Sequence, residues 1–138
     1  MIFIVSTLNA KFDPVKSNLS PEKTLVINQG LNSPKYEGMG FVGIIQEEKL
    51  GLSRSRNLGL EYCCAANIPL PWVICDDDVV YSNGLDEKIL SLSIGNQLYQ
   101  GQIALPDGSQ FKQYGLAWRV KSDLRSAFQV SSVEMIIA

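Results

Sequence analysis

Residues 72–78 read Trp-Val-Ile-Cys-Asp-Asp-Asp, a short apolar run that passes directly into three aspartates. Consecutive apolar residues over this length are typical of a strand that is covered on both faces, as in a parallel sheet. Runs of the same kind occur earlier, at residues 1–7 and 24–28, and Phe-Val-Gly-Ile-Ile occupies residues 41–45. The pattern therefore predicts four buried strands.

The segments between these runs differ in kind. Residues 8–23 are polar, carry two prolines and predict a loop with room for one helical turn, and residues 31–39 predict a second loop. Residues 58–66 are almost all apolar or small, which is typical of a helix buried against a large surface, and Ser53 is the expected N-cap. Strands that alternate with such connections predict an α/β fold with an open, mainly parallel sheet.

Further elements are expected after the aspartates. Residues 85–92 favour a short helix, residues 98–104 a strand, and Pro106-Asp107-Gly108 the turn of a hairpin. No linker and no internal repeat divides the 138 residues, so we expect a single domain over residues 1–138.

Composition excludes several kinds of chemistry. The chain contains no histidine, which removes Ser-His-Asp and Cys-His mechanisms and histidine-ligated zinc. Any metal site must then be built mainly from oxygen ligands, which suits Mg²⁺, Mn²⁺ or Ca²⁺. Because the net charge is -2 and no basic block is present, no nucleic-acid partner is expected. No run approaches the ~18 apolar residues of a transmembrane helix.

The cysteines indicate a reducing environment. Cys63, Cys64 and Cys75 are odd in number and lack paired spacing, so buried thiols are expected rather than a disulfide framework. This favours a cytoplasmic protein, either free in the cytosol or peripheral to a membrane.

The acidic run is the sharpest functional signal. Neighbouring carboxylates repel one another, and a divalent cation removes the repulsion while using their oxygens as ligands. In an extended stretch Asp76 and Asp78 point to one side and Asp77 to the other, so Asp76 and Asp78 are the expected metal ligands. A solvated loop or a helix cap is the alternative interpretation of these three residues.

Other polar groups are expected at the same edge, because ligands bind outside the carboxyl ends of parallel strands. Ser6 and Thr7 end the first strand and offer hydroxyl groups. Asn28 ends the second strand and is suited either to a nucleobase or ribose or to a simple turn.

The beginning of the predicted helix is polar and cationic. A helix N-terminus attracts anions, and Arg54 and Arg56 are suited to phosphate oxygens. Ser53, Arg56 and Asn57 share one helix face, whereas Arg54 points elsewhere. The alternative is that the arginines pair with Glu47, with Glu48 or with a core carboxylate.

Three segments carry a family resemblance. They are Val5-Ser6-Thr7-Leu8-Asn9, Gly51-Leu52-Ser53-Arg54-Ser55-Arg56-Asn57 and Ile74-Cys75-Asp76-Asp77-Asp78. In their order and rough spacing they resemble glycosyltransferase family 2. The Gly-Leu-Ser-x-x-Arg-Asn segment followed by a hydrophobic strand and an acidic triplet is a fairly specific combination, and the match covers about the first two-thirds of the chain.

The resemblance implies a GT-A architecture, which is Rossmann-like, and transfer of a sugar from a nucleoside diphosphate, with a UDP-sugar favoured. The acceptor would be a glycan or a lipid-linked molecule, as in polysaccharide biosynthesis, and Mn²⁺ or Mg²⁺ would bridge the diphosphate. Carried over to this chain, Asp76 faces the nucleotide beside Asp77, Asp78 binds the metal, and Arg56 and Asn57 fall on the family's Arg-Asn pair.

The chain also departs from the family. Leu8 stands where an aromatic residue is frequent, and no acid stands near Asn28, where the family reads uracil. Family catalytic domains are longer, with the acceptor site and the catalytic base in their later part. We therefore expect a domain that is incomplete at its C-terminus, without an assigned base, in which a second copy of the chain as a homodimer is one way to supply the missing half.

Two other functions stay open at this point. One is a non-catalytic module that binds a sugar nucleotide or a metal, and the other is a nucleotidyltransferase, which also presents acids at strand ends to a metal and a nucleotide.

Overall fold

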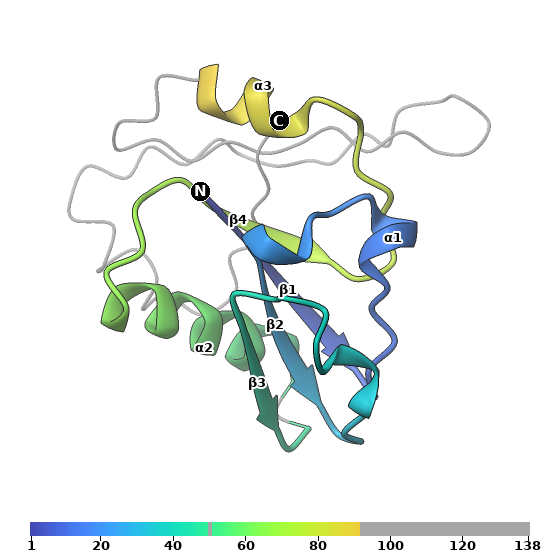
Figure 1. Cartoon of the computed structure of the whole chain (residues 1–138). Coiled ribbons are helices and arrows are strands. Elements are labelled where there is room, and N and C mark those ends of the chain that lie inside the picture. Colours follow the sequence, from blue (N-terminus) through green and yellow to red (C-terminus); the bar gives the residue numbers. More distant parts are fainter. Residues whose placement is uncertain (50, 92–138) are drawn as a thin grey trace, which may run out of the picture.

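The computed structural model describes residues 1–49 and 51–91 (Figure 1). The elements in chain order are β1 (Ile2–Leu8), α1 (Pro14–Ser17), β2 (Thr24–Gln29), β3 (Gly43–Glu47), α2 (Leu52–Ala65), β4 (Trp72–Asp76) and α3 (Leu85–Ser91). Short 3-10 turns occupy Pro21–Lys23 and Pro34–Tyr36. The strand predicted at residues 98–104, the turn at residues 106–108 and the full extent of the domain lie outside the described residues.

The strands form one sheet whose pairings are all parallel, in the order β3-β2-β1-β4. This confirms the predicted α/β class with an open parallel sheet. The chain lays β2 and β3 on one side of β1 and then crosses to place β4 on the other side. The strand order therefore reverses between β1 and β4, and such a reversal point is where open α/β sheets bind ligands, outside the carboxyl ends of the strands.

Both faces of the sheet are covered, and among the described helices α2 is the one that covers the first face. Side chains alternate along a strand, so each strand contributes to both faces. The face under α2 is formed by Ile2, Ile4, Leu25, Ile27 and Ile74, packed against Leu60 and Cys63 of the helix. The opposite face holds Phe3, Val5, Val26, Val73 and Cys75, covered by Phe12 and Leu19 of the β1–β2 connection, by Tyr36 and by Ile89 of α3. Figure 1 shows α2 on one side of the sheet and α1 and α3 on the other.

A glycine sets the close approach of α2 to the sheet. A Cβ atom added at Gly59 would lie 2.3 Å from the Cγ2 atom of Ile4. Real contacts are never this short, so a side chain at this position would push the helix away from β1. The close approach brings the first turns of α2 against the ends of β1 and β4.

The predicted strand at residues 41–45 is shifted and is less buried than expected. It begins at Gly43 and ends at Glu47, and its residues alternate between partly buried and exposed, with Ile44 43% exposed. The prediction of full burial was wrong for this strand, because β3 lies at the edge of the described sheet and a five-residue apolar run does not reveal that position.

The predicted cap of α2 was also wrong. The helix begins at Leu52 and its N-cap is Gly51, with φ of 90° and no side-chain cap hydrogen bond. Ser53 lies inside the first turn and is exposed. Glycine takes the N-cap because only a residue without Cβ adopts this backbone angle freely, and its N–H donates to Oε1 of Gln29 at 3.1 Å.

The helix predicted over residues 85–92 is found as α3. All three cysteines are free thiols, and Cys63 and Cys75 are buried as expected, whereas Cys64 is only partly buried. Within residues 1–49 and 51–91 no helix is both long enough and apolar enough to cross a bilayer.

Candidate functional site

The candidate site lies at the carboxyl ends of β1 and β4, where the strand order reverses. Ser6 of β1 and Asp76 of β4 are paired in register, and Thr7 follows on the opposite face of the sheet. Because the two strands are neighbours in the sheet, the polar residues at their carboxyl ends lie next to one another. The structure thus brings together Ser6, Thr7 and the acidic run, as expected from the sequence.

On the face covered by α2, two side chains of the helix contact these strand ends. The Ser55 hydroxyl donates to Oγ of Ser6 at 2.9 Å, and Nη2 of Arg56 donates to Oδ1 of Asp76 at 2.8 Å. The Arg56 side chain is 9% exposed, whereas that of Asp76 is 40% exposed. The carboxylate of Asp76 therefore contacts the buried guanidinium of Arg56 on one side and solvent on the other.

Arg56 is incompletely satisfied. Its Nε atom is buried and has no hydrogen-bond partner in the described part of the chain. A buried donor without a partner costs about 1–3 kcal/mol, and more on a charged group. Native proteins keep few such groups, so each one calls for an explanation beyond packing.

On the opposite face, Thr7 holds the second aspartate. The Thr7 hydroxyl donates to Oδ2 of Asp77 at 2.6 Å and accepts the N–H of Phe12 at 3.0 Å. The Tyr36 hydroxyl donates to the carbonyl of Phe12 at 3.1 Å. Burial of Tyr36 raises the pKa of its phenol to about 12, so this hydroxyl keeps its proton and remains a donor. Asp77 is thereby tied to the buried residues Thr7, Phe12 and Tyr36.

The acidic run is not extended throughout. β4 ends at Asp76, and Asp77 and Asp78 form a turn in which Asp78 is exposed. The predicted extended geometry, with Asp76 and Asp78 on one side, therefore needs correction. The first two aspartates do point in opposite directions as predicted, because Asp76 pairs with α2 on one face and Asp77 with Thr7 on the other.

Tyr81 is a site residue that the sequence interpretation missed. Its hydroxyl accepts the backbone N–H of Asp76 at 3.0 Å and donates to the carbonyl of the same residue at 3.3 Å. Burial raises the pKa of this phenol well above its ordinary value. The only signal in the sequence was an aromatic residue with a hydroxyl shortly after Val79-Val80, which does not show that the chain folds back onto its own strand.

Asn28 is fully engaged within the protein. Its Oδ1 accepts the N–H of Ala10 at 2.8 Å, and its Nδ2 donates to the carbonyl of Leu31 at 3.0 Å and to Oε1 of Gln46 at 2.7 Å. The side chain is fully buried. Asn28 lies in register with Thr7 and fastens the loops that follow β1 and β2. Its predicted contact with a nucleotide stays a prediction.

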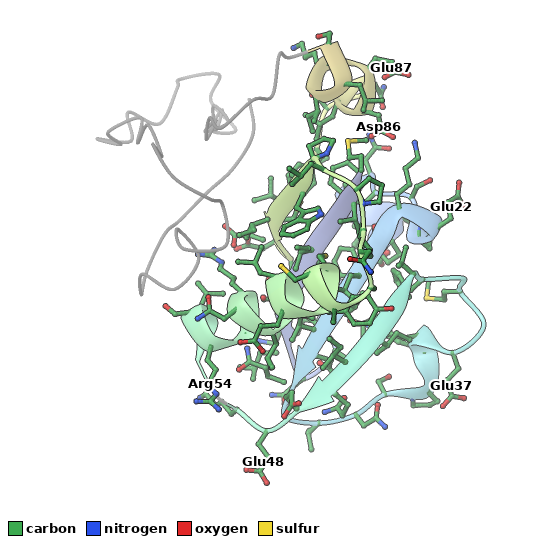
Figure 2. The ribbon with its side chains drawn as sticks, turned by 90° about the vertical axis from the view of Figure 1, so that its left-hand side faces the viewer. Glu22, Glu37, Glu48, Arg54, Asp86 and Glu87 are labelled. Atoms are coloured by element: carbon green, nitrogen blue, oxygen red, sulfur yellow. The ribbon has the colours of Figure 1, made fainter. Side chains whose placement is uncertain are left out.

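Arg54 lies apart from these contacts. It is exposed on the first turn of α2, and Figure 2 shows it with Glu48 at one end of the molecule, opposite the end that carries Asp86 and Glu87 of α3. The two arginines of the helix are therefore different in kind, with Arg56 paired and buried and Arg54 directed to solvent.

Among the described residues no group of three acidic, cysteine or histidine side chains lies together as a set of metal ligands. A Mg²⁺ ion bound with a nucleotide does not require such a set, because one or two carboxylates and the phosphates commonly suffice. The exposed Asp78 and the half-exposed Asp76 fit that requirement, since a metal site at this edge can be reached from solvent.

In comparisons with known proteins, no protein-family model matches this chain, and no curated protein is significantly similar to it.

Proposed function

We propose that this chain is the nucleotide-sugar-binding domain of a glycosyltransferase with the GT-A architecture, similar to family 2. It would bind a nucleoside-diphosphate sugar, with a UDP-sugar favoured, together with Mn²⁺ or Mg²⁺. The sugar would pass to a hydroxyl of a glycan or lipid-linked acceptor.

One observation supports the proposal most strongly. The acidic turn lies at the point where the strand order of a parallel sheet reverses, and two of its carboxylates are anchored on opposite faces of that sheet. A purely solvated loop needs no such anchors. Asp76 and Asp77 hold the turn in one orientation, so Asp78 is presented to solvent from a rigid support.

Different residues would bind the cation and the phosphates. Asp78, with Asp76, would hold the cation, which when bound neutralises the diphosphate and favours its departure from the sugar. The Arg56 guanidinium keeps Asp76 oriented and adds positive charge next to the acidic turn, where a diphosphate would lie. The exposed Arg54 and the first turn of α2, which has no side-chain cap, add a second favourable region for phosphate oxygens.

Calorimetric titration of the full chain with UDP, with and without Mn²⁺, tests the proposal. We expect Mn²⁺ to strengthen UDP binding at least about tenfold, and Asp78→Ala to remove this gain, a difference of about 1.4 kcal/mol or more. Glu37→Ala is the control, because Glu37 is an exposed acid that follows the 3-10 turn Pro34–Tyr36 and is not part of the acidic turn (Figure 2).

Turnover then separates the enzyme from a binding module. Release of UDP from a UDP-sugar, whether to water or to an added acceptor, would support the glycosyltransferase. Binding of UDP by the folded chain that does not depend on Mn²⁺ or on Asp78 would refute the site.

A further inference from the structure

Asp76, the first residue of the acidic run, is held by its backbone as well as by its side chain. The hydroxyl of Tyr81 is hydrogen-bonded to both the N–H and the C=O of Asp76. β4 is an edge strand in the described sheet, and an edge leaves such groups without a neighbouring strand. At the last residue of β4, the phenol takes the place that a further strand would have.

Tyr81 itself is fixed to the body of the protein. Its N–H donates to the carbonyl of Ser17 at 3.0 Å, and its carbonyl accepts from Nδ2 of Asn18 at 2.9 Å. Asn18 is the C-cap of α1, in the left-handed conformation with φ of 58°, and also donates to Oδ1 of Asn83 at 2.8 Å. The ring of Tyr81 packs against the core on the face away from α2.

The acidic turn is consequently fixed by hydrogen bonds at both of its ends. At one end of the turn, Asp76 is hydrogen-bonded to Arg56 and to the Tyr81 hydroxyl. At the other end, Tyr81 is hydrogen-bonded to Ser17 of α1. Asp77 and Asp78 lie between these two fixed points, and Thr7 adds a third contact through Asp77. Removing the Tyr81 hydroxyl would release the backbone of the turn without removing any of the three carboxylate groups.

We propose that Tyr81 is a positioning residue for the cation in the nucleotide site, acting through the backbone of Asp76 to fix the direction of the Asp78 carboxylate. This inference rests on the proposed function. We therefore expect the hydroxyl of Tyr81 to affect the metal-dependent part of nucleotide affinity and to leave the metal-independent part unchanged. A tyrosine that only stabilises the fold would not separate the two.

Tyr81→Phe tests this expectation, since it removes the hydroxyl and keeps the ring. Tyr81→Phe removes two hydrogen bonds to the backbone of Asp76. We expect the Mn²⁺ concentration needed for half-maximal strengthening of UDP binding to rise about fivefold, with metal-free UDP affinity unchanged within about twofold. Tyr62→Phe is the matched control, because the Tyr62 hydroxyl lies beside Gly43 at the amino end of β3, away from the acidic turn.

A double variant shows whether Tyr81 acts through Asp78. In an Asp78→Glu background, which keeps a carboxylate for the cation but displaces it, Tyr81→Phe should cause a smaller loss of Mn²⁺-dependent binding than in the wild type, because the carboxylate that Tyr81 positions is already displaced. Asn18→Gly offers a second route if Tyr81→Phe folds poorly. It keeps the left-handed C-cap, removes the amide that anchors Tyr81, and should weaken Mn²⁺-dependent binding in the same direction.

The outcomes are distinct. If wild-type protein shows no Mn²⁺-dependent UDP binding, the proposed function fails and the role of Tyr81 falls with it. If the wild type binds and Tyr81→Phe titrates with Mn²⁺ like the wild type, only the positioning role is overturned. An equal loss of metal-free and metal-dependent binding would likewise assign Tyr81 to folding alone.

Discussion

Arg56 is a single residue that stability alone does not explain. Its guanidinium is almost fully buried, it pairs with a carboxylate that is 40% exposed, and its Nε has no partner among the described residues. Burying a charge costs several kcal/mol, and an ion pair repays this cost only when its geometry is good and its remaining donors are satisfied. We therefore interpret Arg56 as retained for the acidic turn that it orients.

This interpretation predicts a separation of stability from binding at Arg56. Arg56→Met keeps most of the side-chain volume and removes both the charge and the unsatisfied donor. The free energy of unfolding in urea should stay within about 1 kcal/mol of the wild type or rise. The Mn²⁺-dependent UDP affinity should fall about tenfold. A loss of several kcal/mol in Arg56→Met would show instead that the ion pair is needed for the fold.

At the scale of elements, the contact between α2 and the sheet places the two halves of the site together. Ser55 and Arg56 reach Ser6 and Asp76 because the helix lies close over β1. That closeness depends on Gly59, which faces Ile4 where no Cβ fits. A glycine in a helix interior is unfavourable by about 1 kcal/mol relative to alanine, so its presence here reflects packing and not helix propensity.

Gly59→Ala should therefore destabilise the protein despite the better helix propensity of alanine. We expect a loss of about 1–3 kcal/mol in the free energy of unfolding, the range for overpacked cores. The double variant Ile4→Ala, Gly59→Ala removes the methyl group that the new Cβ would meet, so its loss should be smaller than the sum of the two single losses. Strict additivity, measured by urea unfolding, would contradict the proposed clash.

At the scale of the whole molecule, burial on both sheet faces controls how the protein responds to alkaline pH. Burial raises the pKa of the Cys75 thiol to about 12 and that of Cys63 to about 11, both from an ordinary value of 9.0. Tyr36 is raised from 10.0 to about 12 by the same cause. In each case the folded protein holds its proton more tightly than the unfolded chain.

The sign of the pH dependence follows. Below pH 9 these thiols are protonated in both states and their contribution to stability is complete, and it is lost as pH rises from about 9 towards 12, because the unfolded chain releases protons that the folded protein keeps. Urea unfolding under reducing conditions should show stability falling in this range. Cys75→Ala should reduce the slope by about 1.4 kcal/mol per pH unit, the value for one proton. An equal slope in this variant would exclude Cys75 as a cause.

Much of the site could be anticipated from the sequence because strand ends are local features. Apolar runs located β1, β2 and β4 to within a residue or two, and the parallel class of the sheet implied that their carboxyl ends share an edge. Asn28 shows where this reasoning stops. It was correctly placed at a strand end, but its amide is occupied by the connections after β1 and β2 and by Gln46 of β3, which no local pattern reveals.

The sequence by itself determined the α/β class, the four described strands (β3 displaced by two residues), the helix that becomes α2, and the position of the acidic run directly after a buried strand. Hydrophobic periodicity and the lack of histidine are local or global counts, and they need no knowledge of pairing. Only the tertiary structure decided the strand order, the exposure of β3, the Gly51 cap, the pairing of Arg56 with Asp76 and the return of Tyr81 onto β4. Those features depend on contacts between residues far apart in the chain, whose geometry is set by packing, and a one-dimensional pattern carries no such distances.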